Sequence, residues 1–313
     1  MSTSSGSIVI GTRGSALARW QAAEIGRLLR EAHPGLEVSE KIVVTQGDRV
    51  QTGPVIDLGG KGVWVKEIEE GLLARDIDVA VHSMKDVPAE LAPGLAIVAV
   101  PTRADPRDAI VSRDGGGLAA LPAGSRVGTS SLRRVCQVRA VRADLSVEIL
   151  RGNVDTRLRK VAEGAVDAAV LACAGLDRLG FSDRISERLD AARMLPAIGQ
   201  GALAIEARRD DQRVRDLCRR LSDPSAEATV AAERGLLSGL GVGCRTPVAG
   251  YATLSGNHLT VRGLVGRPDA SEMLTDSVTG SVEDAAALGG QLARRLIDAG
   301  AGRILAELDG AVP

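Results

Sequence analysis

The sequence contains very few aromatic residues. Phe, Trp and Tyr together make up 1% of its 313 residues. We therefore expect a core of aliphatic side chains, and the chain lacks the set of rings on which nucleic-acid bases stack. Because the formal net charge is −1, the composition provides no general attraction to nucleic acid or to a membrane surface. The sequence thus predicts neither kind of partner.

Long apolar runs are missing as well. No run approaches the ~18 residues that a membrane span needs, and the opening MSTSSGSIVIG lacks the basic and apolar regions of a secretory signal. Four cysteines occur without CxxC or Cys/His spacing, which argues against a zinc site and against a disulfide framework. We therefore expect a cytoplasmic, reducing location and no bound metal.

The remaining composition is that of an ordinary globular protein, with 44% hydrophobic and 25% charged residues. Strand and helix patterns alternate twice along the chain, which predicts two open α/β lobes with mixed, largely parallel sheets. A strand in 194–209 is expected to return to the first sheet. Residues 247–280 alternate as in an antiparallel meander, within a small C-terminal α+β domain. The predicted domains are 1–101 plus 202–219, 107–195 and 224–313.

Two local patterns give sharper predictions. A helix is expected from about Ser15 to Ala32, with Ser15 as its N-cap and HPG after it as the stop signal. The apolar run DAAVLACAGL (167–176) is read as a strand throughout.

Positive charge is concentrated in residues 126–160, with nine Lys and Arg against three Asp and Glu. Arg133 and Arg134 open a helix directly after a strand, and Arg151 ends the next strand. Open α/β sheets bind ligands at the carboxyl ends of their strands, and helix N-termini favour anions. Arginine forks suit carboxylates. The pattern therefore indicates a polycarboxylate or phosphate ligand.

The first lobe repeats this arrangement with Arg13 and Ser15 after its first strand. Lys61, in GGKG, adds a loop cation, although the spacing is not that of a Walker loop. The other cations of 126–160 are interpreted as solvated helix-face residues: Arg139, Arg142, Arg159 and Lys160.

VHSMKDVP (81–88) brings His82, Ser83, Lys85 and Asp86 together at a strand end. An aspartate beside a lysine keeps a low pKa and stays anionic. Such a carboxylate can stabilise a cationic intermediate or relay protons. The alternative is a local Lys–Asp pair on the surface.

Cys244 lies in a glycine-rich stretch, GLGVGCRTPVAG, whereas the other three cysteines are expected to be buried. Glycine neighbours allow another group to approach the backbone closely. None of the three histidines has the context of a catalytic partner for a thiol. Cys244 is therefore read as an attachment point, with a packed loop cysteine as the alternative. The other cysteines are Cys136, Cys173 and Cys218.

Eight stretches run in order through nearly the whole chain: GTRGSALA, GGKG, VHSMKDVP, GTSSLRR, LRGNVDTR, AGLDRLG, LPAIGQGA and GVGCRTPVAG. Together they resemble the porphobilinogen deaminase (hydroxymethylbilane synthase) family of haem biosynthesis. The resemblance implies two lobes like those of periplasmic binding proteins and a third domain that carries the cysteine. It also implies a monomeric transferase that adds four porphobilinogen units to a dipyrromethane cofactor, held by a thioether at Cys244.

The resemblance also implies roles for individual residues. Asp86 is the implied catalytic carboxylate, and Lys61 and Gln200 are contacts of second rank. The implied ligands of the cofactor carboxylates are Ser83, Lys85, Ser131, Arg133, Arg134 and Arg157. The implied ligands of the substrate carboxylates are Arg13, Ser15, Gln21, Arg151 and Arg178. The chain departs from many relatives at Asp57, Trp64 and Val242.

Two other functions are compatible with parts of the sequence. A non-catalytic two-lobe module for a small carboxylate ligand would have the same composition, but it has no use for Cys244 and Asp86 together. A cysteine-nucleophile acyl transferase would need a histidine partner that the sequence does not reveal.

Overall fold

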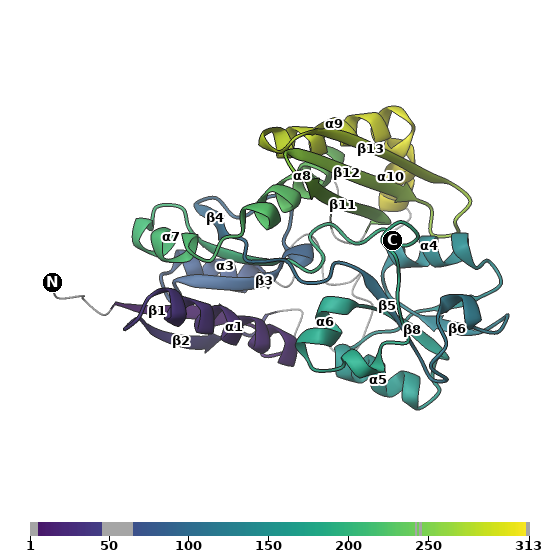
Figure 1. Cartoon of the computed structure of the whole chain (residues 1–313), viewed down its shortest axis with the longest axis horizontal. Helices are drawn as coiled ribbons and strands as arrows, with labels where there is room; N and C mark the ends of the chain where they lie inside the picture. Colours follow the sequence, from purple (N-terminus) through teal and green to yellow (C-terminus); the bar gives the residue numbers. More distant parts are fainter. Residues whose placement is uncertain (1–5, 46–64, 242, 244–245, 311–313) are drawn as a thin grey trace. The chain divides into compact units, whose positions relative to one another are not determined.

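The computed structural model describes residues 6–45, 65–241, 243 and 246–310 (Figure 1). The chain forms two compact units. The first comprises Met1–Arg103 and Ala202–Glu227, and the second comprises Ala104–Gly201 and Ala228–Pro313. The predicted division into three domains, with 107–195 separate from 224–313, stays a prediction.

The first unit contains a five-stranded mixed sheet of order β2-β1-β3-β10-β4. Strands β1, β2 and β3 run parallel, and β10 is antiparallel to both β3 and β4. The predicted return of a strand from 194–209 to the first sheet is confirmed by β10. The elements of this unit are β1 (Ser7–Thr12), α1 (Ala16–Ala32), β2 (Glu37–Ile42), α3 (Lys66–Leu73), β3 (Val79–Ser83), β4 (Leu95–Ala99), β10 (Leu203–Arg208) and α7 (Gln212–Arg219).

Strand alternation decides which helix covers which face of this sheet. Val79 and Val81 of β3 pack with Ile25 of α1 and with α7, whereas Ala80 packs with Ile68 of α3. Successive side chains of a strand point to opposite faces, so α1 and α7 cover one face and α3 the other. Helix α1 begins as predicted, because the Ser15 hydroxyl accepts a hydrogen bond from Ala18 N at 3.3 Å.

The second unit repeats this topology in its first half, with a sheet of order β7-β6-β8-β5-β9. Strands β6, β7 and β8 are parallel, and β5 is antiparallel to β8 and β9. Helix α4 packs on one face of this sheet, and α5 and α6 pack on the other. The elements are β5 (Asp108–Ser112), β6 (Arg126–Gly128), α4 (Leu132–Val141), β7 (Ser146–Glu148), α5 (Val154–Ala162), β8 (Ala168–Ala172), α6 (Cys173–Arg178) and β9 (Glu187–Arg188).

One predicted element is wrong in part. The run 167–176 is a strand only to Ala172, and the helix α6 begins at Cys173. The four residues from Cys173 to Leu176 are all buried, so the run shows no change of hydrophobic period where the strand becomes a helix. Periodicity cannot separate a buried strand from a buried helix in such a run.

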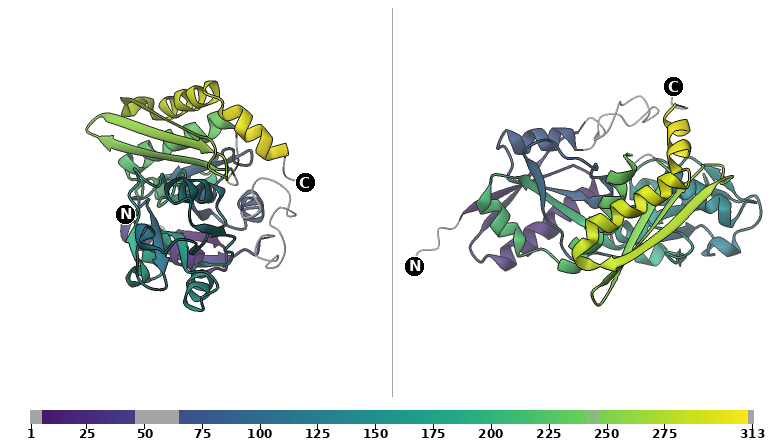
Figure 2. Two further views of the ribbon diagram at one scale, coloured as in Figure 1. Left: turned by 90° about the vertical axis from the view of Figure 1, so that its right-hand side faces the viewer. Right: turned by 90° about the horizontal axis from the view of Figure 1, so that it is seen from above.

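The C-terminal part of the chain forms the predicted antiparallel meander, β11-β12-β13, flanked by helices (Figure 2). Leu236 of α8 and Leu292 and Leu296 of α9 lie against Gly263 of β12. The fold class predicted from the sequence is therefore confirmed: two α/β lobes with mixed sheets and a C-terminal antiparallel sheet. The elements are α8 (Pro224–Leu240), β11 (Val248–Ser255), β12 (His258–Gly266), β13 (Met273–Ser281), α9 (Ala285–Asp298) and α10 (Ala301–Gly310).

No helix in the described part of the chain combines the length and the apolar character required to cross a membrane.

The contact between α8 and α9 depends on glycine. A Cβ atom added to Gly289 would overlap the carbonyl oxygen of Ala232 and would lie 2.6 Å from Leu236 N. We expect Gly289→Ala to lower the free energy of unfolding by about 1–3 kcal/mol, because a backbone obstacle forces the helices apart. Gly290→Ala is the matched control, since only Arg294 Nη1 lies near, at 3.9 Å. Urea unfolding of both variants tests this, and equal stability would contradict the close approach.

Candidate functional site

The first unit places several of the predicted residues at one edge of its sheet. Arg13 and Ser15 follow β1, Ser83 ends β3, and Lys85 and Asp86 lie in the short 3-10 turn after it. Because β1 and β3 are parallel, their carboxyl ends meet at the same edge. The edge thus combines two hydroxyl groups, two cations and a carboxylate.

Local contacts fix the backbone of the Asp86 turn. Gln21, buried on α1, donates a hydrogen bond from Nε2 to Ser83 Oγ at 2.8 Å. Met84 N donates to Ala202 O at 3.0 Å, and the buried Met84 and Val87 side chains flank the turn. Asp86 itself is exposed. The turn therefore presents this carboxylate on a well-anchored backbone.

A buried acid–base pair lies behind the same strand. His82 Nε2 is 2.9 Å from Glu206 Oε2 of β10, and both side chains are buried. His82 points to the α3 face, opposite to Ser83, and Glu69 of α3 lies near the pair. Burial raises the pKa of Glu69, and the charge of Glu206 adds to this rise. Sequence reasoning noticed His82 but missed Glu206, although a charge in the apolar strand LAIEAR was a usable signal.

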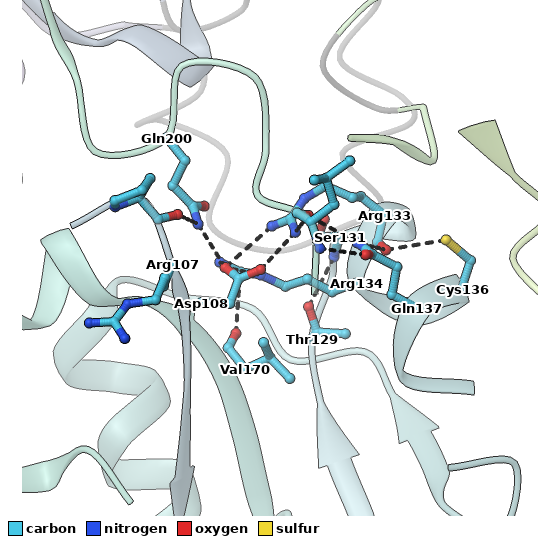
Figure 3. A network of polar contacts seen from close by, with 12 residues as sticks. Arg107, Asp108, Thr129, Ser131, Arg133, Arg134, Cys136, Gln137, Val170 and Gln200 are labelled. Carbon is cyan, nitrogen blue, oxygen red and sulfur yellow. Dashed lines mark hydrogen bonds and ion pairs between the residues drawn. The ribbon is translucent and has the colours of Figure 1, made fainter. Parts of the chain in front are cut away.

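The second unit is organised around a buried carboxylate (Figure 3). Asp108, the first residue of β5, is completely buried and pairs with both Arg133 and Arg134 of α4. Arg133 Nη1 donates to Asp108 Oδ2 at 2.7 Å, and Arg134 Nη2 donates to Oδ1 at 2.7 Å. Burial would raise the pKa of Asp108, but the two guanidinium charges outweigh it and hold this pKa well below its usual range.

Three further contacts extend this network. Gln200 Nε2 donates to Asp108 Oδ1 at 2.9 Å and to Pro106 O at 2.7 Å (Figure 3). Arg133 Nη1 donates to Leu195 O, and Arg134 Nη1 donates to Val170 O, both at 2.9 Å. The network therefore joins β5, α4, β8 and the connection that leads from Leu195 to Gly201.

The remaining predicted residues of this unit follow the parallel strands. Ser131 precedes α4, and its N–H donates to Thr129 Oγ1 at 3.2 Å. Arg157 Nε donates to Gly152 O at 2.7 Å, and Arg178 Nη2 donates to Gly201 O at 2.7 Å. Arg151 is half-buried after β7. Ser131 and Arg151 thus lie just after β6 and β7, whereas Arg157 lies within α5 and Arg178 is the last residue of α6.

The backbone at position 201 requires glycine. Its φ is +89°, and a Cβ at this position would lie 2.5 Å from Ala104 O. A side chain would therefore clash with the backbone next to the carbonyl that Arg178 binds.

The sequence identified candidate site residues, but it did not predict which of them contact one another. Within the described residues, the structure joins Gln21 to Ser83 and joins Arg133, Arg134 and Gln200 through Asp108. Asp108 was missed. The predicted residues Lys61 and Cys244 lie outside the described residues, as do Asp57, Trp64 and Val242.

The interpretation of four cations as solvated helix-face residues is wrong for three of them. Arg142 donates to Leu118 O and Leu121 O, both at 2.8 Å, and its side chain is largely buried. Arg139 donates to Pro268 O at 2.8 Å, and Lys160 donates to Arg151 O at 3.2 Å. Arg139 and Arg142 bind carbonyl groups of distant segments, and Lys160 binds one in the connection that precedes its own helix; helical periodicity indicates none of these contacts. Arg159 is exposed and pairs with Glu163, as predicted.

The three cysteines expected in the core are buried. Burial raises the pKa of the Cys136 thiol to about 11 and the pKa values of the Cys173 and Cys218 thiols to about 12. Since the thiolate is the nucleophilic form, these three thiols are unreactive near neutral pH.

Comparison with known proteins identifies related sequences along nearly the whole chain. Residues 8–216 match the family "Porphobilinogen deaminase, dipyromethane cofactor binding domain", and residues 228–298 match "Porphobilinogen deaminase, C-terminal domain". The porphobilinogen deaminase of Syntrophobacter fumaroxidans is 50% identical over 301 residues, which cover 96% of this chain and 97% of that protein. The porphobilinogen deaminase of Roseiflexus castenholzii is 49% identical over 300 residues, covering 96% and 99%.

Among solved structures, the VFT2 domain of Bordetella pertussis BvgS aligns with 69% of this chain and 85% of its own, at 18% identity and a TM-score of 0.40.

The buried thiols lead to a test of cysteine reactivity. We expect iodoacetamide at pH 8 to leave Cys136, Cys173 and Cys218 unmodified in the native protein, because their raised pKa values and burial suppress the thiolate. In denaturant all three become reactive. Peptide mass spectrometry of Cys244→Ser, in which these are the remaining cysteines, measures both states. Rapid labelling of the native variant would contradict the assignment of these thiols to the core.

Proposed function

The chain belongs to the porphobilinogen deaminase family, and from this we propose how its own residues carry out that family's reaction. The enzyme is a transferase of tetrapyrrole synthesis that joins porphobilinogen molecules and releases ammonia. We propose that four units are added head to tail to a dipyrromethane primer, and that hydroxymethylbilane is the product. The observation that carries this proposal is the match of residues 8–216 to the cofactor-binding domain of the family. Membership of this family favours catalysis over a non-catalytic binding module.

The described residues fit a dipyrromethane group. Each of its two rings bears an acetate and a propionate, so the group requires several cationic partners. In the second unit, Arg133 and Arg134 together carry one more positive charge than Asp108 balances. A buried excess of positive charge is costly without an anion, and a ligand carboxylate supplies one.

The primer is proposed to be bound through a thioether at Cys244. The other cysteines, Cys136, Cys173 and Cys218, are buried, and their thiol pKa values are raised. Cys244 is the remaining cysteine of the sequence, and it lies outside the described residues. When bound, the primer supplies the terminal pyrrole carbon that attacks the incoming unit.

Asp86 is proposed as the catalytic carboxylate. Loss of ammonia from porphobilinogen leaves a cationic azafulvene, which an anion held nearby stabilises electrostatically. The exposed Asp86 carboxylate, on a turn anchored by Met84 and Ser83, suits this task. The same carboxylate accepts hydrogen bonds from pyrrole N–H groups and assists the proton transfers that accompany each addition.

The remaining residues are proposed to bind carboxylates, and Lys61 and Gln200 are proposed to assist them. The proposed primer ligands are Ser83, Lys85, Ser131, Arg133, Arg134 and Arg157. The proposed substrate ligands are Arg13, Ser15, Gln21, Arg151 and Arg178.

We further propose a cytoplasmic monomer with three domains, 1–101 plus 202–219, 107–195 and 224–313. The buried free thiols support a reducing compartment, since disulfides are rare there.

Primer attachment is tested by intact-protein mass spectrometry after expression in a host that makes porphobilinogen. We expect the wild-type protein to be heavier than its sequence by two linked pyrrole units, because the Cys244 thiol forms the thioether. Cys244→Ser should have its bare sequence mass, and Cys218→Ser, which removes a buried thiol, should load normally. Equal mass gains in Cys244→Ser and the wild type would refute the anchor.

The catalytic carboxylate is tested with Asp86→Ala. We expect kcat to fall by about 10²–10⁴-fold, the range for loss of a positioned acid–base group. Because Asp86 is exposed, unfolding should change by less than about 0.5 kcal/mol. Asp114→Ala removes another exposed aspartate and is the matched control. Ammonia release and circular dichroism measure both effects, and normal turnover by Asp86→Ala would show that the carboxylate is misassigned.

A further inference from the structure

A buried polar pair lies at the end of the strand that leads to Asp86. His82 Nε2 of β3 is 2.9 Å from Glu206 Oε2 of β10, and the side chains of both residues are at least nine-tenths buried. With Glu206 ionised, the ring N–H of His82 is the donor, because a carboxylate only accepts. The other oxygen of Glu206, Oε1, is also buried and accepts no hydrogen bond from the described residues. His82 is therefore the hydrogen-bond partner on which this carboxylate depends.

The alignment of β3 with β10 is not set by a turn. His82 and Glu206 are 124 residues apart in the chain, so no hairpin joins the two strands. On the other side of β10, the ladder with β4 is irregular between Ile205 and Glu206, and it therefore guides β10 poorly. Around the pair, His82 faces Ala204 and Glu206 faces Ala80. Because alanine side chains are small and apolar, the hydrogen bond is the directional contact in this part of the sheet face.

The opposite end of the strand pair has a polar anchor of its own. Arg208, two residues after Glu206 on the same face of β10, donates from Nη1 to Leu72 O and Ile77 O, both at 2.7 Å. Ile77 precedes β3, whereas His82 is the next-to-last residue of β3. The two anchors therefore act at different ends of β3, and loss of one leaves the other in place.

The ladder between β3 and β10 continues into the turn that carries Asp86. Ser83 faces Leu203, and one residue further on Met84 N donates to Ala202 O at 3.0 Å. A displacement of the strand end would therefore move the turn as well, by about 3.4 Å for each residue of slip.

Stability alone does not account for a polar pair at this position. Replacing a buried ion pair with well-packed apolar side chains is often neutral or stabilising, because burial removes the hydration of both charges. The best-attested benefit of a buried polar contact is the selection of one alignment over others. His82 and Glu206 meet the conditions for this role, since they lie on neighbouring strands directly before the turn.

We propose that His82 and Glu206 are positioning residues, which fix the carboxyl end of β3 against β10 and thereby place the Asp86 carboxylate. The pair acts through the backbone from residue 82 to residue 86 and does not touch the substrate. The kinetic consequence rests on the proposed function, since it takes Asp86 as the catalytic carboxylate. The structural consequence, a fixed strand end, is independent of that function.

The test removes the pair in a way that preserves the fold. His82→Leu alone leaves a buried carboxylate without its partner and should lower the melting temperature. The double variant, His82→Leu with Glu206→Met, replaces both polar groups with apolar side chains and should melt close to the wild type. Its kcat should nevertheless be about 10–100-fold lower, because Asp86 is displaced. KM should stay within about twofold, because the proposed substrate ligands are unchanged. A merely structural pair predicts that kcat recovers together with the melting temperature.

Hydrogen exchange, followed by NMR, measures the strand end without reference to activity. The Asp78 amide, which donates to Val9 O at 2.9 Å just before β3, is the internal standard. In the double variant, the Met84 amide should exchange about 10–100-fold faster relative to the Asp78 amide, because the strand end opens locally. Arg208→Met is the matched control, since it removes a buried polar residue from the same face of β10 at the other end. It should lower the melting temperature without raising this exchange ratio or reducing kcat.

A conservative variant tests the hydrogen bond itself. Glu206→Gln keeps an oxygen that accepts from the His82 ring N–H but carries no charge. We expect wild-type exchange at Met84 and a kcat within about threefold of the wild type, because the proposed role depends on this contact. If the double variant does not fold, Glu206→Met provides the same comparison with Glu206→Gln, since it lacks the acceptor.

The outcomes separate this inference from the proposed function. Wild-type protein that releases no ammonia from porphobilinogen would refute the function, and the exchange ratios would still decide whether the pair fixes the strand end. Wild-type exchange at Met84 in the double variant would overturn the positioning role, and so would Glu206→Gln exchanging as fast as the double variant. Fast exchange at Met84 together with a wild-type kcat would overturn the link between the strand end and Asp86.

Discussion

The contact between Asp108 and the two arginines of α4 organises the second unit. Asp108 begins β5, Arg134 reaches Val170 of β8, and Arg133 reaches the connection at Leu195. Removing one member of such a buried cluster typically costs about 3–5 kcal/mol, because an unpaired charge stays behind. Arg133 and Arg134 of this cluster are also among the proposed ligands of the primer, so one set of contacts would serve both the fold and the proposed binding site.

The two sheets show how the rest of the site is assembled. Each sheet has three neighbouring parallel strands. An antiparallel strand pairs with the last of these three strands: β10 pairs with β3 in the first sheet, and β5 pairs with β8 in the second. The chain thus crosses between the lobes by inserting a strand into each sheet. Polar residues that follow the parallel strands are gathered at one edge of the sheet in each unit, which is why Arg and Ser recur after strands along the sequence.

Local patterns in the sequence predicted local features well. Ser15 was identified as a cap, and the strand β10 and the meander were placed correctly, because each depends on neighbouring residues. Long-range pairing was not predictable. Asp108 and Glu206 lie in apolar strands, and their partners, Arg133 and His82, are 25 and 124 residues away. Nothing in the spacing of Arg142 indicated that it binds the carbonyl groups of a distant loop.

The burial of Cys136, Cys173 and Cys218 has a chemical consequence. In the proposed reaction the enzyme generates, beside its own side chains, a cation that alkylates soft nucleophiles. A thiol is the softest nucleophile a protein contains, so every accessible cysteine would compete with the growing chain and become a dead-end adduct. By enclosing these three thiols in apolar surroundings and keeping them protonated, the fold would protect the enzyme from its own intermediate and leave Cys244 as the proposed place of self-modification.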